Sequence, residues 1–250
     1  MEGKVTTSIE NGIGKIIFAH PKSNSLPGVL LNQLAKAISD FGADKEVKVI
    51  LLLSEGDKTF CAGASFDELL SINDKETGKT FFSGFAKVIL AMRACPKFVV
   101  IKVQGRAIGG GVGIVAAADY SFALATASVK LSELTIGIGP FVIGPAVERK
   151  IGVSAFSSLS VNSAQWQSAQ WAFDKGLYSA MFEKEEELDA ELSALLKNLS
   201  GSSPDAMNKI KEMLWEGTDH WVKLLPERAA ISGELVLSEQ TKAILSQFRK

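Results

Sequence analysis

Cysteine and histidine are scarce in this chain, which has two of each among 250 residues. Cys61 and Cys95 are too few for a disulfide framework, so we expect a reducing compartment, the cytoplasm. His20 and His220 lie far apart in the sequence, and neither a CxxC nor an HExxH pattern occurs. A metal site of conventional spacing is therefore not expected.

An excess of charge of either sign is also missing, because 27 lysines and arginines balance 28 aspartates and glutamates. A net charge of −1 gives no electrostatic reason to expect nucleic acid or an anionic membrane as a partner. No apolar run approaches the ~20 residues of a membrane helix. The first ten residues lack the apolar segment of a signal peptide, so we expect a soluble enzyme or binding protein.

The arrangement of apolar residues predicts an α/β fold. Apolar runs alternate with helical patterns in the first part of the chain, which favours a parallel sheet covered by helices. We expect a core over residues 1–180 and a helical region over 181–250. Expected strands cover 5–9, 15–19, 47–53, 98–103, 120–125 and 129–131. Expected helices cover 27–41, 67–72, 76–92, a stretch ending near 118, 183–199, 204–215 and 226–248, and the pattern after 144 is almost entirely helical.

Three segments that follow apolar strands carry the residues with chemical potential. They are FCAGASF at 60–66, GRAIGGGVG at 105–113 and LSELTIGIGP at 131–140. Small residues let a ligand approach the backbone closely, and the free N–H groups of two such segments can converge on one oxygen as an oxyanion hole. Glu133 lies in an otherwise apolar segment, and burial would raise its pKa toward that of a useful general acid or base.

Other interpretations of these residues stay open at this point. The glycines could serve only close packing of a helix on a strand, and Ser132 with Glu133 could be a helix cap. Cys61 fits a small buried apolar residue better than a nucleophile, because no histidine is near it in the sequence. The GxGxxA pattern at 111–116 resembles a dinucleotide-binding turn, although five loop residues separate the preceding strand from its glycine run.

Together the segments resemble the motifs of the enoyl-CoA hydratase/isomerase (crotonase) family. The segment 60–66 is similar to the family's CAGAD, 105–113 to its G-x-A-x-G-G-G loop, and 131–140 to its P-E-x-x-x-G. PKSNSL at 21–26 resembles R-P-x-x-x-N-A-L, and 169–179 resembles A-x-x-x-G-L-V. The motifs agree in order and spacing from residue 5 to about 180, which makes the resemblance more specific than any single motif.

The resemblance implies a crotonase-like spiral of ββα units with a helical C-terminal region that serves oligomerisation and covers the active site. It implies homotrimers or dimers of trimers and an acyl-CoA thioester as substrate, with no separate cofactor because coenzyme A is part of the substrate. The thioester carbonyl would lie between the backbone N–H groups of Ala64 and Gly110, with Glu133 as the catalytic acid and base.

The resemblance also implies which residues contact the ester. Ser65 replaces the family's usual Asp, but the backbone around it would still hold the adenine end of coenzyme A. Residues expected to contact the substrate or its coenzyme A are Lys22, Ala62, Ser65, Phe66, Gly109 and Gly113. Residues expected to shape the acyl pocket are Phe81, Phe82, Phe85, Phe141 and Val142.

The catalytic side chains depart from the family pattern at Gly113, where hydratases carry a second glutamate. Hydration needs a held and activated water, whereas double-bond migration needs one base and a stabilised enolate. We therefore predict an enoyl-CoA isomerase of fatty acid metabolism. An enoyl-CoA hydratase (lyase) and a non-catalytic acyl-CoA binder are the alternatives.

Overall fold

The computed structural model describes residues 3–247 and begins with the expected hairpin. Strands β1 (Lys4–Glu10) and β2 (Ile13–Ala19) pair in antiparallel register. The two residues between them, Asn11 and Gly12, have φ angles of +51° and +79°. Positive φ at both positions matches the twist of a tight hairpin, which is why Asn-Gly predicts this turn.

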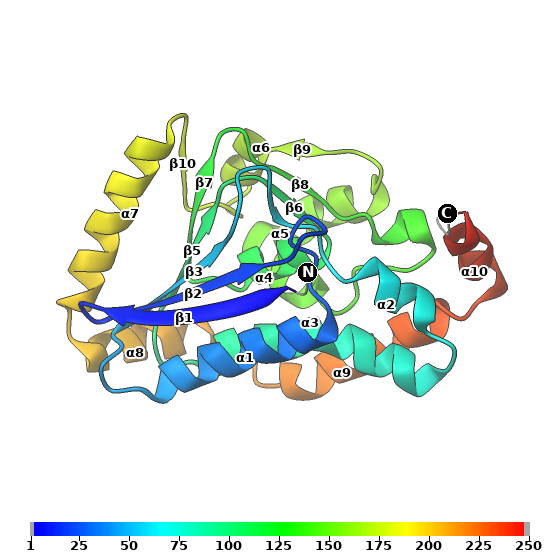
Figure 1. The fold of residues 1–250 in the computed structure, drawn as a ribbon, viewed down its shortest axis with the longest axis horizontal. Coiled ribbons are helices and arrows are strands. Elements are labelled where there is room, and N and C mark those ends of the chain that lie inside the picture. The colour runs from blue at the N-terminus through cyan, green and yellow to red at the C-terminus, as the bar shows by residue number, and fades with distance from the viewer. Residues whose placement is uncertain (1–2, 248–250) are drawn as a thin grey trace.

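The strands form two sheets (Figure 1). The six-stranded sheet has the order β1-β2-β3-β5-β7-β10 and is parallel except for the hairpin. The four-stranded sheet has the order β4-β6-β8-β9, in which only β9 is antiparallel to its neighbour. The remaining strands of the first sheet are β3 (Val49–Ser54), β5 (Val99–Val103), β7 (Tyr120–Leu124) and β10 (Ala180–Phe182). Those of the second are β4 (Thr59–Cys61), β6 (Arg106–Ile108), β8 (Ser128–Lys130) and β9 (Gln167–Ser168).

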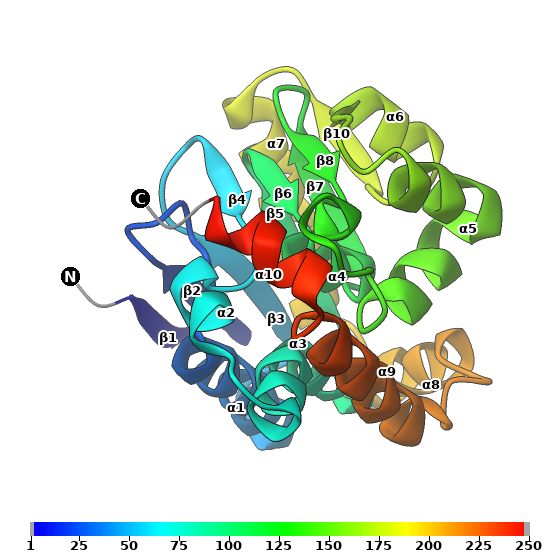
Figure 2. The same ribbon diagram turned by 90° about the vertical axis from the view of Figure 1, so that its right-hand side faces the viewer.

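A ββα unit is repeated three times, and this repetition is the predicted spiral. In each unit one strand joins the large sheet, the next joins the small sheet, and helices follow. Figure 2 shows β4, β6 and β8 next to one another in the small sheet, and it also shows the helical segments that follow these strands. These segments are α2 (Phe66–Ser71) and α3 (Lys75–Ala94), then α4 (Gly110–Ala116), then the 3₁₀ turn η1 (Glu133–Ile136) with α5 (Gly144–Val161).

Helix α9 (Trp221–Leu235), from the C-terminal region, packs on α3, which also packs on α1 (Gly28–Ala43) (Figure 1). The contact is close because glycines face each other: a β-carbon added at Gly78 would lie 2.8 Å from the Gly233 Cα. The close approach of the two backbones holds α9 against α3, which lies on the core.

Helices α7 (Glu185–Ser200) and α8 (Pro204–Leu214) confirm the expected helices at 183–199 and 204–215. The single helix expected over 226–248 is wrong. Instead α9 begins at Trp221 with Pro226 inside it, and α10 (Glu239–Ser246) starts anew after Ser238, which accepts a hydrogen bond from the Thr241 N–H. Burial of Trp221 and Leu225 stabilises a helix across the proline. Phe248 lies outside the described residues.

Four short strands were not predicted. β4 opens the segment 60–66, which is expected only to follow a strand. β6 lies in the segment 105–113, which reads as a loop, and β9 and β10 interrupt the region after 144, which reads as helical. Strands of two or three residues carry no periodic pattern, so pairing with neighbours decides them. β10 crosses the expected boundary at residue 180 and pairs with β7 of the core. Helix α6 (Ala169–Asp174) lies between them in the chain. Within residues 3–247, no helix is both long and apolar enough to span a bilayer.

Candidate active site

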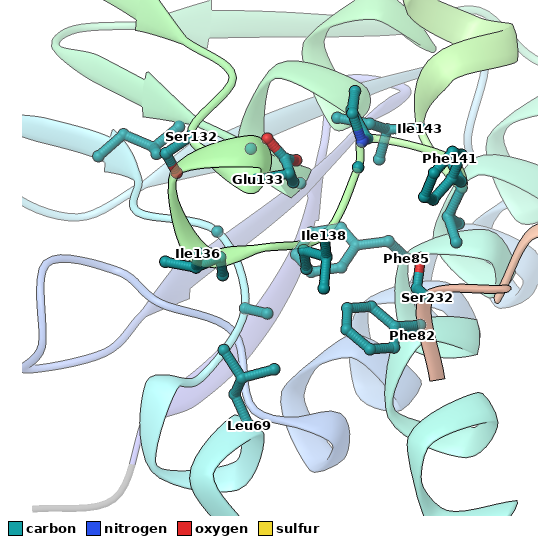
Figure 3. A pocket seen from close by; sticks show the side chains of 18 of the residues that line it. Leu69, Phe82, Phe85, Ser132, Glu133, Ile136, Ile138, Phe141, Ile143 and Ser232 are labelled. Carbon is teal, nitrogen blue, oxygen red and sulfur yellow. The ribbon is translucent and has the colours of Figure 1, made fainter. Parts of the chain in front are cut away.

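The three segments singled out in the sequence meet at one cavity of about 170 Å³ (Figure 3). Its lining includes the backbone of 62–64 and of 108–110 and the side chain of Glu133. Helices α2, α3 and α9 and the loop before α5 supply the other walls. The fold therefore brings together residues that lie up to 170 positions apart, from Ala62 to Ser232.

Two glycines allow the backbone segments to approach each other. Gly63 has a φ of +88°, and a β-carbon there would lie 3.0 Å from the Ile108 carbonyl oxygen and 3.6 Å from the Gly110 nitrogen. Gly109 has a φ of +52° and a ψ of −117°, a backbone conformation restricted to glycine. Ala64 and Gly110 both line the cavity, and no hydrogen bond within the described chain uses the N–H group of either.

Glu133 begins η1, and Leu131 and Ser132 separate it from the end of β8. The residue as a whole is partly exposed, but its Oε2 is buried and has no hydrogen-bond partner among residues 3–247. Its carboxyl lies over Gly109, since a β-carbon there would be 3.0 Å from Oε1. Burial of the carboxyl raises the pKa of Glu133 to about 7, so it exchanges protons near neutrality.

The rest of the cavity is apolar. Glu133 is the only titratable side chain among the described lining residues, and Ser132 and Ser232 are the only others with polar side chains. Figure 3 shows Glu133 and Ile143 on the upper side of the cavity and Phe82 on the opposite side. A lone carboxyl in such surroundings interacts strongly with any charge that develops on a bound ligand, because little water screens it.

Ile143 occupies the space next to Gly113. Gly113 lies in α4 and is absent from the cavity lining, whereas Ile143 is part of it. A β-carbon added at Gly113 would lie 2.4 Å from the Ile143 Cγ2 and 2.6 Å from its Cβ. Ile143 therefore fills the space into which a side chain at position 113 would extend.

The expected substrate-contacting residues divide into two groups. Ala62, Phe66 and Gly109 line the cavity. Ser65, Lys22 and Gly113 do not line it. Ser65 caps α2 by accepting a hydrogen bond from the Glu68 N–H, and Lys22 forms an exposed ion pair with Asp67. Contact of any of these residues with coenzyme A stays a prediction.

All five residues expected to shape the acyl pocket line the cavity: Phe81, Phe82, Phe85, Phe141 and Val142. The sequence reasoning missed Leu69, Ile138, Ile143 and Ser232. Ile138 lies in the third motif and could have been chosen from it. Ser232 has no signal in the sequence, because only the packing of α9 on α3 brings it to the cavity.

Helix α10 packs on the segment that carries Glu133. The Thr241 hydroxyl donates a hydrogen bond of 3.0 Å to the Gly137 carbonyl, one residue beyond η1. Leu245 joins Leu69 and Ile138 in an apolar cluster beside the cavity. Figure 2 shows α10 crossing in front of the core near α2 and α4. The C-terminal helices thus support the cavity from outside.

Two alternative interpretations of the motifs fit the structure poorly. Burial raises the pKa of the Cys61 thiol to about 12, which leaves no thiolate for nucleophilic attack. Gly111 lies inside α4, where a β-carbon would be 2.7 Å from the Cys61 carbonyl oxygen, so it serves close packing rather than a dinucleotide turn. Among residues 3–247 no cluster of three histidine, cysteine or carboxylate side chains could hold a metal ion.

Solved structures define the class of fold. The crystal structure of enoyl-CoA hydratase from Bacillus halodurans superposes with a TM-score of 0.89 at 23% identity, covering 97% of this chain and 99% of that one. An enoyl-CoA hydratase structure from Mycobacterium avium subsp. paratuberculosis gives a TM-score of 0.85 at 22% identity, covering 97% of each chain. The α/β architecture is therefore the crotonase fold, as predicted.

Sequence comparison then identifies the family. The family model for enoyl-CoA hydratase/isomerase matches residues 8–242. Mouse mitochondrial methylglutaconyl-CoA hydratase is 30% identical over 87% of this chain and 67% of its own length. A Bacillus subtilis protein named "Probable enoyl-CoA hydratase" is 24% identical over 98% of this chain and 95% of its own. The chain belongs to the enoyl-CoA hydratase/isomerase family and is an enzyme of the crotonase superfamily.

Proposed function

We propose that this enzyme binds an acyl-CoA thioester and moves a carbon–carbon double bond from the 3,4 to the 2,3 position. The observation that carries the proposal is the single carboxyl of Glu133, whose Oε2 is buried without a hydrogen-bond partner among residues 3–247 in a mostly apolar cavity. A base with a pKa of about 7 is partly ionised at neutral pH, which suits both removal and return of a proton.

In the proposed reaction the thioester carbonyl accepts hydrogen bonds from the N–H groups of Ala64 and Gly110. The Glu133 carboxylate removes a proton from C2 of the 3-enoyl group, and the electron pair delocalises into a dienolate. Both N–H groups are free of hydrogen bonds within the described chain, so they can donate to the negative oxygen and stabilise it. The protonated Glu133 then returns the proton at C4, which leaves the double bond between C2 and C3.

Hydration is the second candidate, and the hydratase names of the relatives favour it. It would require a water molecule held and deprotonated next to C3. Residue 113 is glycine where hydratases carry a second carboxylate, and the Ile143 side chain fills the space beside it. We therefore give isomerisation preference over hydration.

The test supplies purified protein with 3-hexenoyl-CoA and follows conjugation of the thioester by ultraviolet absorbance and product mass. A conjugated product of unchanged mass supports isomerisation. Conversion of 2-hexenoyl-CoA to a product heavier by one water would support hydration instead. Absence of both reactions, with ester binding intact, would contradict both candidates and leave an acyl-CoA binder.

We propose the cytoplasm as the compartment of this reaction. Both cysteines are unpaired and buried, which suits a reducing environment. Assembly into homotrimers or dimers of trimers stays a prediction, which light scattering of the purified protein would check.

A further inference from the structure

Phenylalanine rings from three parts of the chain form much of the cavity wall. The rings of Phe81 and Phe82 on α3 meet edge to face with centroids 4.9 Å apart. The Phe85 ring lies directly against Gly110, because a β-carbon there would be 2.3 Å from the ring. Phe66 and Phe141 complete the aromatic surface. An acyl chain that starts at Gly110 therefore begins in contact with an aromatic ring.

Positive charge is missing from this wall. None of the described lining residues is lysine, arginine or histidine, and the one titratable side chain, Glu133, is acidic. Ser232 is buried, and its hydroxyl donates only a long hydrogen bond of 3.4 Å to the Arg228 carbonyl. A carboxylate on the acyl group would lose its hydration here, gain no counter-charge and approach a carboxyl that becomes negative in the same cycle.

We infer that the enzyme selects uncharged hydrocarbon acyl groups, aliphatic or aromatic, and rejects acyl groups that end in a carboxylate. The inference rests on the proposed binding of an acyl-CoA thioester in this cavity, and it goes further by naming the substrate class. The aromatic wall supplies apolar contact area, and the absence of a cation supplies the discrimination.

Binding of two saturated esters with six acyl carbons tests the inference on the intact protein. Hexanoyl-CoA ends in a methyl group, whereas adipyl-CoA ends in a carboxylate, and neither has a double bond to move. We expect isothermal titration at pH 8 to give a Kd for adipyl-CoA at least 100-fold higher. Equal affinities within threefold would overturn the inference and leave the proposed reaction standing. Failure of both esters to bind would overturn the proposed function and the inference together.

A charge placed in the wall gives a second test. Phe82→Arg introduces a cation among the rings, so the ratio of the two Kd values should fall at least tenfold. Val161→Arg adds the same charge at the end of α5, where the side chain is 74% exposed, and should leave the ratio unchanged. Circular dichroism verifies folding of both variants, and the comparison of esters on the unmodified protein stands without them. A folded Phe82→Arg variant with an unchanged ratio would contradict the inference.

Discussion

Substitution of Glu133 by glutamine should make the protein more stable and less active. The amide has nearly the same size as the carboxyl and carries no charge. A rise of the Glu133 pKa from 4.5 to about 7 on folding corresponds to about 3 kcal/mol of stability lost when the group is ionised. We therefore expect Glu133→Gln to raise the free energy of unfolding by up to about 3 kcal/mol at pH 8.

The sign of this effect follows from proton binding. The folded state binds the Glu133 proton more tightly than the unfolded state, so the loss is absent below pH 4.5, grows toward pH 7 and is complete above it. Urea unfolding at pH 5 and pH 8 measures the difference. Glu216→Gln, which removes an exposed carboxylate, is the matched control and should show little change. If Glu133→Gln gained no more stability at pH 8 than at pH 5, the carboxyl would not be buried as described.

Activity should move in the opposite direction. Loss of a general base lowers kcat by about 10²- to 10⁴-fold, which corresponds to about 3–5 kcal/mol in the activation barrier. Affinity for hexanoyl-CoA should be preserved, because the amide fills the same space. In the unmodified enzyme kcat/KM should rise with pH through an apparent pKa of about 7, since the free enzyme must hold Glu133 ionised. A Glu133→Gln variant that kept most of its turnover would refute the assignment of the base.

Three further perturbations test other parts of the structure. Gly109→Ala should cost about 1–3 kcal/mol and at least tenfold in kcat, because of the positive φ and the 3.0 Å contact with Glu133 Oε1. Gly56→Ala, which also has a positive φ but open space around it, is the control for backbone strain alone and should lower thermal stability without changing turnover. Asp119→Ala leaves the buried Lys211 ammonium without the carboxylate that lies 2.8 Å from it, and should lower the free energy of unfolding in urea by about 3–5 kcal/mol. The control, Asp40→Ala, removes an exposed ion pair with Lys36 and should cost less than about 1 kcal/mol. A thiol reagent should leave Cys61 unlabelled and turnover intact in the folded enzyme, and rapid labelling there would contradict its burial.

Most long elements could be predicted because their patterns are local. Asn11 and Gly12 specify the first turn, and the apolar spacing along α1 and α3 specifies which face each helix buries. The prediction of a single helix starting at Pro226 was wrong. Proline locally favours the start of a helix, but the burial of Trp221 and Leu225 extends α9 to the N-terminal side of Pro226. The short strands β4, β6, β9 and β10 were not predicted for a related reason, since only pairing with neighbouring strands makes these segments strands.

The motifs predicted which backbone segments meet at the site, because each contains small residues directly after an apolar strand. They did not predict the neighbours of these segments. Ile143 lies 30 residues from Gly113, and Ser232 lies on a helix whose contact with α3 depends on Gly78 and Gly233. Such contacts depend on how helices pack, which local pattern does not encode.

The sequence by itself determined the class of fold, the three segments around the cavity and the one titratable side chain, Glu133, among the described lining residues. These properties follow from patterns within about ten residues, where strand, turn and glycine preferences act. Only the tertiary structure decided that the Oε2 of Glu133 is buried without a partner among residues 3–247. It also decided that Ile143 closes the space beside Gly113 and that no cation lies among the described residues of the aromatic wall. Desolvation and steric exclusion depend on every atom around a group, and those atoms come from elements far apart in the chain.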